Sequence, residues 1–283
     1  MIVKHLPRVT LLTRMLALVL LLTLSGCIQM HTTVHVKKDG SGTIEQKMLF
    51  TGMLSEIMNS PDQGGEPDKA PAPPSEKQLS EMAAEFGPDV KAVGVQKIDN
   101  RKEQGFAVTY AFDDINKVRI GNAQQMTMNH SADSTSVKRE STATQKPETW
   151  FTFAMKRGAN PELIISKQSE INASSRKISA SDSKSKPSAK EQTQMLDMIK
   201  PFLKGLKMSM EVIVDGRVVS SDASYRIGNR ITLYSMDFDK ILARPDLLTG
   251  KYEGMSDKEF TRKSGKNSGL KFESKDRVSV FFN

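Results

Sequence analysis

Alternation of apolar and polar residues recurs along the chain in short runs, and each run predicts a strand with one buried face. The first two runs lie within residues 28–50 and are separated by a glycine-containing turn. For their apolar faces to coincide, Val36 must lie opposite Ile44 across a loop of three or five residues. That register also places His35 opposite Glu45 on the solvent face. The sequence therefore predicts a β-hairpin here, with a glycine at positive φ in its loop.

Similar patterns predict the rest of the secondary structure. Further hairpins are expected at 90–112, 151–165, 208–219 (around Asp215-Gly216) and 225–236, and a last strand at 278–282. Apolar residues spaced three and four apart predict helices over 51–59, 75–86 and 192–206, and a short one after Asp237. Together these elements predict an α+β fold, in which hairpins form an antiparallel β-sheet and amphipathic helices pack on one of its faces.

Three segments contain too few apolar residues to contribute to a core: 61–74, 122–147 and 169–189. Such segments cannot bury enough apolar surface to offset the entropy lost on ordering, so we expect disordered linkers that proteases cut first. The sequence thus predicts one α+β domain over 27–245 interrupted by these linkers. A polar tail with a final strand is expected over 246–283.

The first 26 residues are typical of an export signal. They contain three basic residues and no acidic one, then an apolar run over 15–24, and they end in Ser25-Gly26 before Cys27. The run is shorter than the roughly 20 apolar residues of a membrane span. Leu24-Ser-Gly-Cys27 resembles the bacterial lipobox, which implies cleavage between Gly26 and Cys27 and acylation of the cysteine. Because Cys27 is the only cysteine, it has no partner for an intramolecular disulfide.

This resemblance also implies a location. In Gram-negative lipoproteins an Asp after the acylated cysteine implies retention in the inner membrane, and here that residue is Ile28. The expected location is therefore the periplasmic face of the outer membrane, or the outer face of the cell membrane if there is no outer membrane. Removal of Lys4, Arg8 and Arg14 with the signal lowers the net charge from +8 to +5. No stripe of Arg and Lys indicates a nucleic-acid partner.

The second half of the chain contains a recurring arrangement of strands and glycine turns. Met210–Val219 reads MEVIVDGRVV and Ala223–Leu233 reads ASYRIGNRITL. Together with the run Cys27–Gly42, these segments resemble the LppM-type domain of bacterial lipoproteins. The resemblance covers roughly 27–58, 80–112 and 195–245 and implies an α+β domain that binds lipid or envelope components. Asp215-Gly216 stands where the family usually has Pro-Gly, and the C-terminal transmembrane helix of some members is missing.

The motifs that carry chemistry are absent from the sequence. Besides His130, the mature chain has only His31 and His35 as histidines, and it has no Gly-x-Ser-x-Gly elbow. His31 and His35 are about 13 Å apart along one strand, so a solvated strand face is favoured over a shared metal ion. Asp237 and Asp239 fit helix capping better than a cation site.

Methionines at Met195, Met198, Met208 and Met210 have core spacing, which favours packing over copper binding. The sequence predicts no catalytic residue, cofactor or metal, and leaves the ligand-binding residues open. We expect a non-enzymatic lipoprotein, attached to the membrane through its lipid, that binds a lipid or another envelope component. The alternatives are a structural or assembly lipoprotein that makes only protein contacts and, third, a hydrolase.

Overall fold

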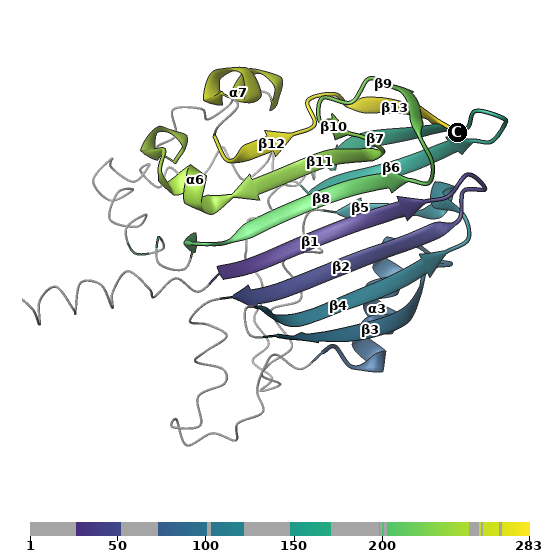
Figure 1. Cartoon of the computed structure of the whole chain (residues 1–283), viewed down its shortest axis with the longest axis horizontal. Helices are drawn as coiled ribbons and strands as arrows, with labels where there is room; N and C mark the ends of the chain where they lie inside the picture. Colours follow the sequence, from purple (N-terminus) through teal and green to yellow (C-terminus); the bar gives the residue numbers. More distant parts are fainter. Residues whose placement is uncertain are drawn as a thin grey trace, which may run out of the picture.

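The structure is a computed structural model that describes residues 27–51, 73–100, 103–121, 148–170, 198, 200, 203–248, 255, 257–265 and 268–283. Within these described residues, thirteen strands form two sheets (Figure 1). The larger sheet has the order β10-β11-β8-β1-β2-β4-β3, with β12 also paired to β11, and the smaller has the order β5-β6-β7-β13-β9.

The strands are β1 Cys27–Val36, β2 Gly42–Thr51, β3 Lys91–Asp99, β4 Glu103–Phe112, β5 Arg119–Gly121, β6 Glu148–Lys156, β7 Glu162–Glu170, β8 Lys207–Val214, β9 Val218–Ser221, β10 Arg226–Ile227, β11 Arg230–Asp237, β12 Leu270–Phe272 and β13 Arg277–Phe282. The helices are α3 Glu76–Phe86, α6 Phe238–Leu242 and α7 Asp257–Ser264, with 3-10 turns η2 Ile115–Lys117 and η5 Pro245–Leu247. None of these described helices has the length and apolar character needed to span a membrane.

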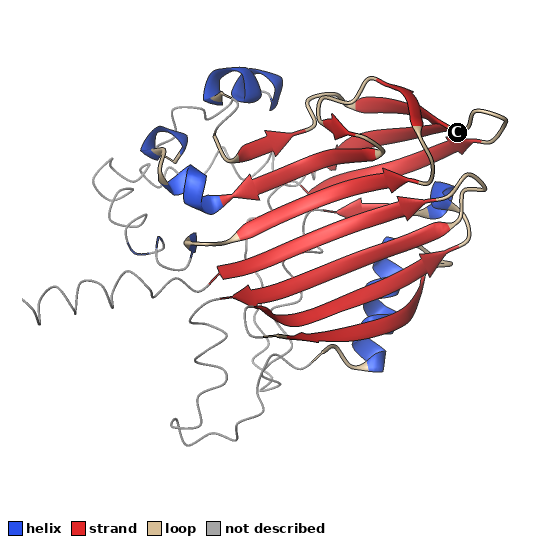
Figure 2. Cartoon of the chain, in the orientation of Figure 1, coloured by secondary structure: helices blue, strands red, loops and turns tan. Residues whose placement is uncertain are grey.

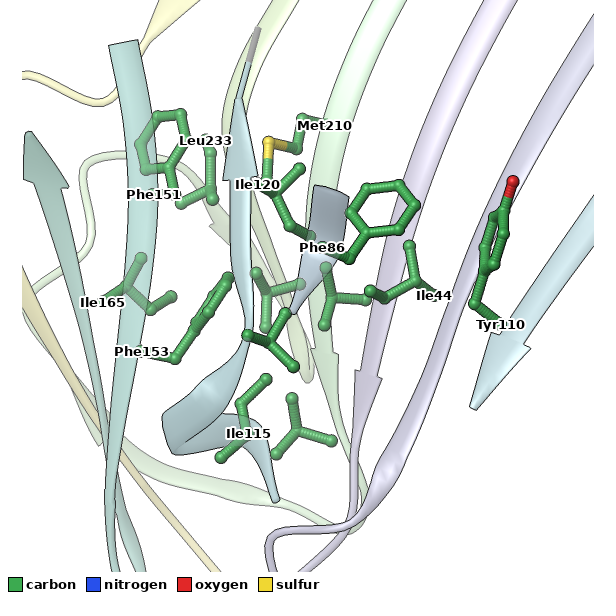
Figure 3. Close-up of a cluster of buried hydrophobic side chains, with 14 of the residues drawn as sticks. Ile44, Phe86, Tyr110, Ile115, Ile120, Phe151, Phe153, Ile165, Met210 and Leu233 are labelled. Carbon is green, nitrogen blue, oxygen red and sulfur yellow. The ribbon is translucent and has the colours of Figure 1, made fainter. Parts of the chain in front are cut away.

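The prediction of an α+β fold with helices packed on one face of a single sheet is wrong. A second sheet faces the inner side of the larger sheet, and its strands lie behind those of the larger sheet in Figure 1. Phe151, Phe153 and Ile165 of the smaller sheet belong to the same core as Met210 and Leu233 of the larger one (Figure 3). The described helices are short and do not form a layer, as Figure 2 shows. Apolar strands of the smaller sheet therefore provide the burial that helices were expected to provide.

Helix α3 is nevertheless where the sequence predicts it. Ser75 is its N-cap and forms a capping box with Gln78. Ala83 and Phe86 are buried, and the Phe86 ring lies 5.0 Å from the ring of Tyr110 in β4. The helix predicted over 51–59 falls outside the described residues except for Thr51, as do the three predicted linkers apart from a few residues at their ends. Of the helix predicted over 192–206, the structure describes residues 198, 200 and 203–206.

The first hairpin is present, but its predicted register is wrong by two residues. Val34 pairs with Ile44 and Val36 with Gly42, so His35 lies opposite Thr43 and not Glu45. The connecting loop holds five residues, 37–41, and Gly40 has a φ of 86°. The apolar faces still coincide, because a shift of two residues keeps each side chain on its own face.

Several pairings depart from a sheet built only of hairpins. Strand β1 pairs in parallel with β8, about 180 residues further along the chain. The Asp215-Gly216 turn does not close a hairpin, because it leads from β8 in the larger sheet to β9 in the smaller one. Strand β9 then pairs with β13, which lies between β7 and β9. The chain thus connects the two sheets at the end of β8.

Candidate functional site

The outer face of the larger sheet, which points away from the smaller sheet, contains two hollows. The first has a volume of about 310 Å³ and is called the Ser209 hollow. In the strand register Ser209 lies between His31 of β1 and Ser235 of β11. Two small serine side chains therefore lie among longer charged ones, which leaves a depression. Its lining consists of His31, Lys207, Met208, Ser209, Glu211, Arg230, Ser235, Met236 and Asp237.

His31 and Ser209 form the central contact of this hollow. The Nδ1 atom of His31 lies 2.7 Å from Oγ of Ser209, and Nε2 lies 3.5 Å from Oε1 of Gln29. An amide oxygen can only accept, so the Gln29 contact favours a proton on Nε2. Nδ1 then accepts a hydrogen bond from the Ser209 hydroxyl. The arrangement holds the imidazole in one orientation against the sheet.

Burial lowers the pKa of the His31 imidazole below its ordinary value of 6.5. The carboxylate of Glu211 opposes this shift, whereas the ammonium groups of Lys47 and Lys207 lower the pKa further. His31 is therefore predominantly neutral at pH 7.

This lowered pKa predicts a pH dependence of stability. Below pH 6.5 the unfolded chain binds a proton at His31 more readily than the folded protein does, so protonation favours unfolding. His31 therefore lowers the unfolding free energy only below about pH 6.5. This loss of stability grows as the pH falls through the pKa of the folded protein. We expect His31→Gln to reduce the dependence of the unfolding free energy on pH between about 7 and 5. Urea unfolding at each pH measures this, and equal slopes in the two proteins would contradict it.

Charged pairs surround the Ser209–His31 contact. The guanidinium of Arg230 donates to Glu211 Oε2 in an ion pair, and Thr232 donates its hydroxyl hydrogen to Oε1 of the same carboxylate at 3.3 Å. On the other side of Ser209, Lys207 of β8 lies opposite Asp237 of β11 in the backbone register of the two strands. Each basic residue of this hollow therefore has an acidic residue on the neighbouring strand.

The second hollow, called the His35 hollow, continues along the same face toward the end of β1. Its volume is about 460 Å³. Its lining consists of His35, Val36, Lys37, Thr43, Glu45, Thr109, Ile213, Val214, Asp215 and Asn229. Ile213 is two residues beyond Glu211 on β8, and Asn229 is adjacent to Arg230, so the two hollows adjoin.

The hydroxyl–imidazole pair meets only the first requirement of nucleophilic catalysis. A base lies within hydrogen-bonding distance of a hydroxyl. Acyl transfer also needs N–H donors for the oxyanion. Ser209 lies in a central strand paired on both sides, with β1 and β11. The backbone N–H groups of such a strand serve the ladders and do not point at a ligand on the face. The absence of enzymatic activity stays a prediction.

Sequence reasoning missed the pairing of His31 with Ser209, because 178 positions separate the two residues. It weighed His31 and His35 together as one candidate metal site, and the structure places them in different hollows. Among the described residues, no three His, Cys, Asp or Glu side chains are grouped so that they could hold a metal ion.

The two aspartates at the start of α6 act differently from the capping prediction. Asp237 is the N-cap residue, but its side chain makes no capping hydrogen bond and instead lies 3.4 Å from Lys240 Nζ. Asp239 accepts a hydrogen bond from the backbone N–H of Gly205 at 2.8 Å. Asp237 thus contacts a residue of α6 itself, and Asp239 connects α6 to the segment before β8.

The structure describes some of the methionines that were weighed as copper ligands, and it describes the backbone of Cys27, the expected acylation site. Met208 and Met210 are buried in the core, as packing requires, whereas Met198 is 72% exposed and Met195 lies outside the described residues. Cys27 is the first residue of β1 and pairs with Thr51, and the signal up to Gly26 lies outside the described residues.

The fold and this face define a two-sheet β-protein with a polar, hollowed outer surface. No family model and no curated protein matches the chain. Among solved structures it is similar to the folded domain of the LppM protein of Mycobacterium tuberculosis, determined by NMR. The identity is 10%, the match covers 92% of this chain and 91% of that one, and the TM-score is 0.31. A likeness this low does not place the chain in that family.

Proposed function

We propose that the protein is a lipid-anchored envelope lipoprotein whose sheet domain binds an envelope component without chemical conversion. The observation that carries this proposal is that one strand contains both the acylation candidate and the candidate site. Strand β1 begins at Cys27, and its outer face carries His31 and His35 in the two hollows. The proposed anchor and the proposed binding face are therefore joined by a few residues of β1, with no linker between them.

Strand geometry limits the height of each hollow above the proposed anchor. At about 3.3 Å per residue, His31 lies about 13 Å and His35 about 26 Å from Cys27 along β1. The Ser209 hollow then faces the zone just above the lipid headgroups. Two or three acyl chains on Cys27 provide a stable anchor, since each buried CH₂ contributes about 0.8 kcal/mol. Ile28 after the cysteine favours the periplasmic face of a Gram-negative outer membrane, and otherwise the protein lies on the outer face of the cell membrane.

Assembly with another protein is the second candidate function, and the edge strand β3 favours it. This strand pairs with β4, and no other strand of the described chain pairs with it. Val93 is 60% exposed and Val95 37% exposed along it. An exposed edge of this kind can accept a strand from a partner.

Replacement of the anchor residue tests the proposal. We expect Cys27→Ala to remain uncleaved and to incorporate no radiolabelled fatty acid, because no thiol is left to acylate. Ser25→Ala, which keeps a small residue before the cysteine, is the matched control and should be labelled and processed normally. Recovery of labelled, processed protein from the Cys27→Ala strain would end the lipoprotein proposal.

A further inference from the structure

We propose that the outer face of the larger sheet, from the Ser209 hollow to the His35 hollow, binds a neutral carbohydrate chain. This inference rests on the proposed function and names its ligand class. The volumes of about 310 and 460 Å³ are each within the usual range of small-molecule sites, roughly 300–1,000 Å³. Because the hollows adjoin along β8, one extended ligand can occupy both.

The charges that line this face are nearly balanced, which favours a neutral ligand over an anionic one. Lys207, Arg230 and Lys37 line the two hollows together with four carboxylates, those of Glu211, Asp237, Glu45 and Asp215. Arg230 is already paired with Glu211. Burial keeps His31 predominantly neutral at pH 7. A phosphate or an anionic headgroup would therefore meet four lining carboxylates beside three lining cations, one of which is already paired.

The hydrogen-bonding groups on the face match those of a sugar. A sugar hydroxyl both donates and accepts, so it is best bound where fixed donors and acceptors alternate. Here carboxylates accept beside guanidinium and ammonium donors, the hydroxyls of Ser235, Thr43 and Thr109 do both, and the Ser209 oxygen can still accept. Charge-assisted hydrogen bonds of this kind are the stronger ones. The Glu211–Arg230 pair holds its donor and acceptor in place before a ligand arrives.

The charged side chains of the Ser209 hollow also disfavour an acyl chain there, because burying them against hydrocarbon would cost their hydration. Ile213 is the apolar side chain of the His35 hollow that points to the outer face, and it offers a small surface for the C–H face of a sugar ring. The face therefore suits the carbohydrate of an envelope polymer or of a glycolipid headgroup.

Titration of the full anchored chain in detergent with two neutral oligosaccharides, chitotetraose and maltotetraose, tests the inference. We expect at least one of them to bind saturably, with amide NMR shifts on β1 and β8, and inorganic phosphate to cause none. Ser209→Leu fills the first hollow and should weaken binding at least tenfold. Thr152→Leu, a similar change on the smaller sheet, is the matched control and should bind like the wild type.

Arg230→Gln provides a second test at an exposed position, where a folding defect is not expected, and it should also weaken binding. The inference is overturned if neither oligosaccharide binds, if the shifts lie elsewhere, if phosphate binds instead, or if neither substitution weakens binding. Acylated protein that binds neither sugar overturns this inference alone. The lipoprotein proposal is tested separately, by the fatty-acid labelling of Cys27, so the failure of one proposal can be told from the failure of the other.

Discussion

Gly105→Ala is expected to destabilise the protein by about 3 kcal/mol or more. Gly105 lies in β4 between β2 and β3 with a φ of 152°, a backbone conformation that other residues rarely adopt. A Cβ atom there would lie 1.9 Å from the backbone oxygen of Met48. Relief of that overlap requires β2 and β4 to separate, which breaks ladder hydrogen bonds in the larger sheet.

The urea midpoint of unfolding measures this effect, and a second glycine of the same sheet is the control. Gly94 lies in the edge strand β3, and a Cβ atom added there meets nothing within 4 Å. We expect Gly94→Ala to change the stability by no more than about 0.5 kcal/mol. If the two substitutions shifted the midpoint equally, the close approach of β4 to β2 would not be the cause.

Phe86→Ala is expected to cost about 3–5 kcal/mol, the usual loss for a large core deletion. Phe86 is 1% exposed and connects α3 to Tyr110 of the larger sheet. Its truncation leaves a cavity at the contact that holds the helix in the core. We also expect faster amide hydrogen exchange throughout α3, because the helix loses its largest buried side chain.

Phe281→Ala is the matched control, since the same side chain is 37% exposed in β13. Its loss should be smaller than that of Phe86→Ala, because less apolar surface is withdrawn from water there. Denaturant unfolding of both variants measures the two losses of unfolding free energy. A Phe86→Ala protein no less stable than Phe281→Ala would show that α3 contributes little to the core.

The sequence by itself determined the local elements of this protein. Period-two alternation marks β4, β6, β8 and β13, and apolar residues spaced three and four apart mark α3. These signals are local, because neighbouring residues decide whether side chains alternate or follow a helical turn. The same alternation determined which face of the first hairpin is buried. It could not determine the register, since a shift of two residues preserves the faces and only the loop conformation chooses between them.

Only the tertiary structure decided which strands are neighbours. A strand of either sheet has the same apolar alternation, so the pattern cannot tell a second sheet from a longer first one. The expected helical layer was wrong for this reason. The parallel pairing of β1 with β8 likewise joins segments about 180 residues apart, and no local signal carries it. His31 and Ser209, the centre of the candidate site, meet only because of that pairing.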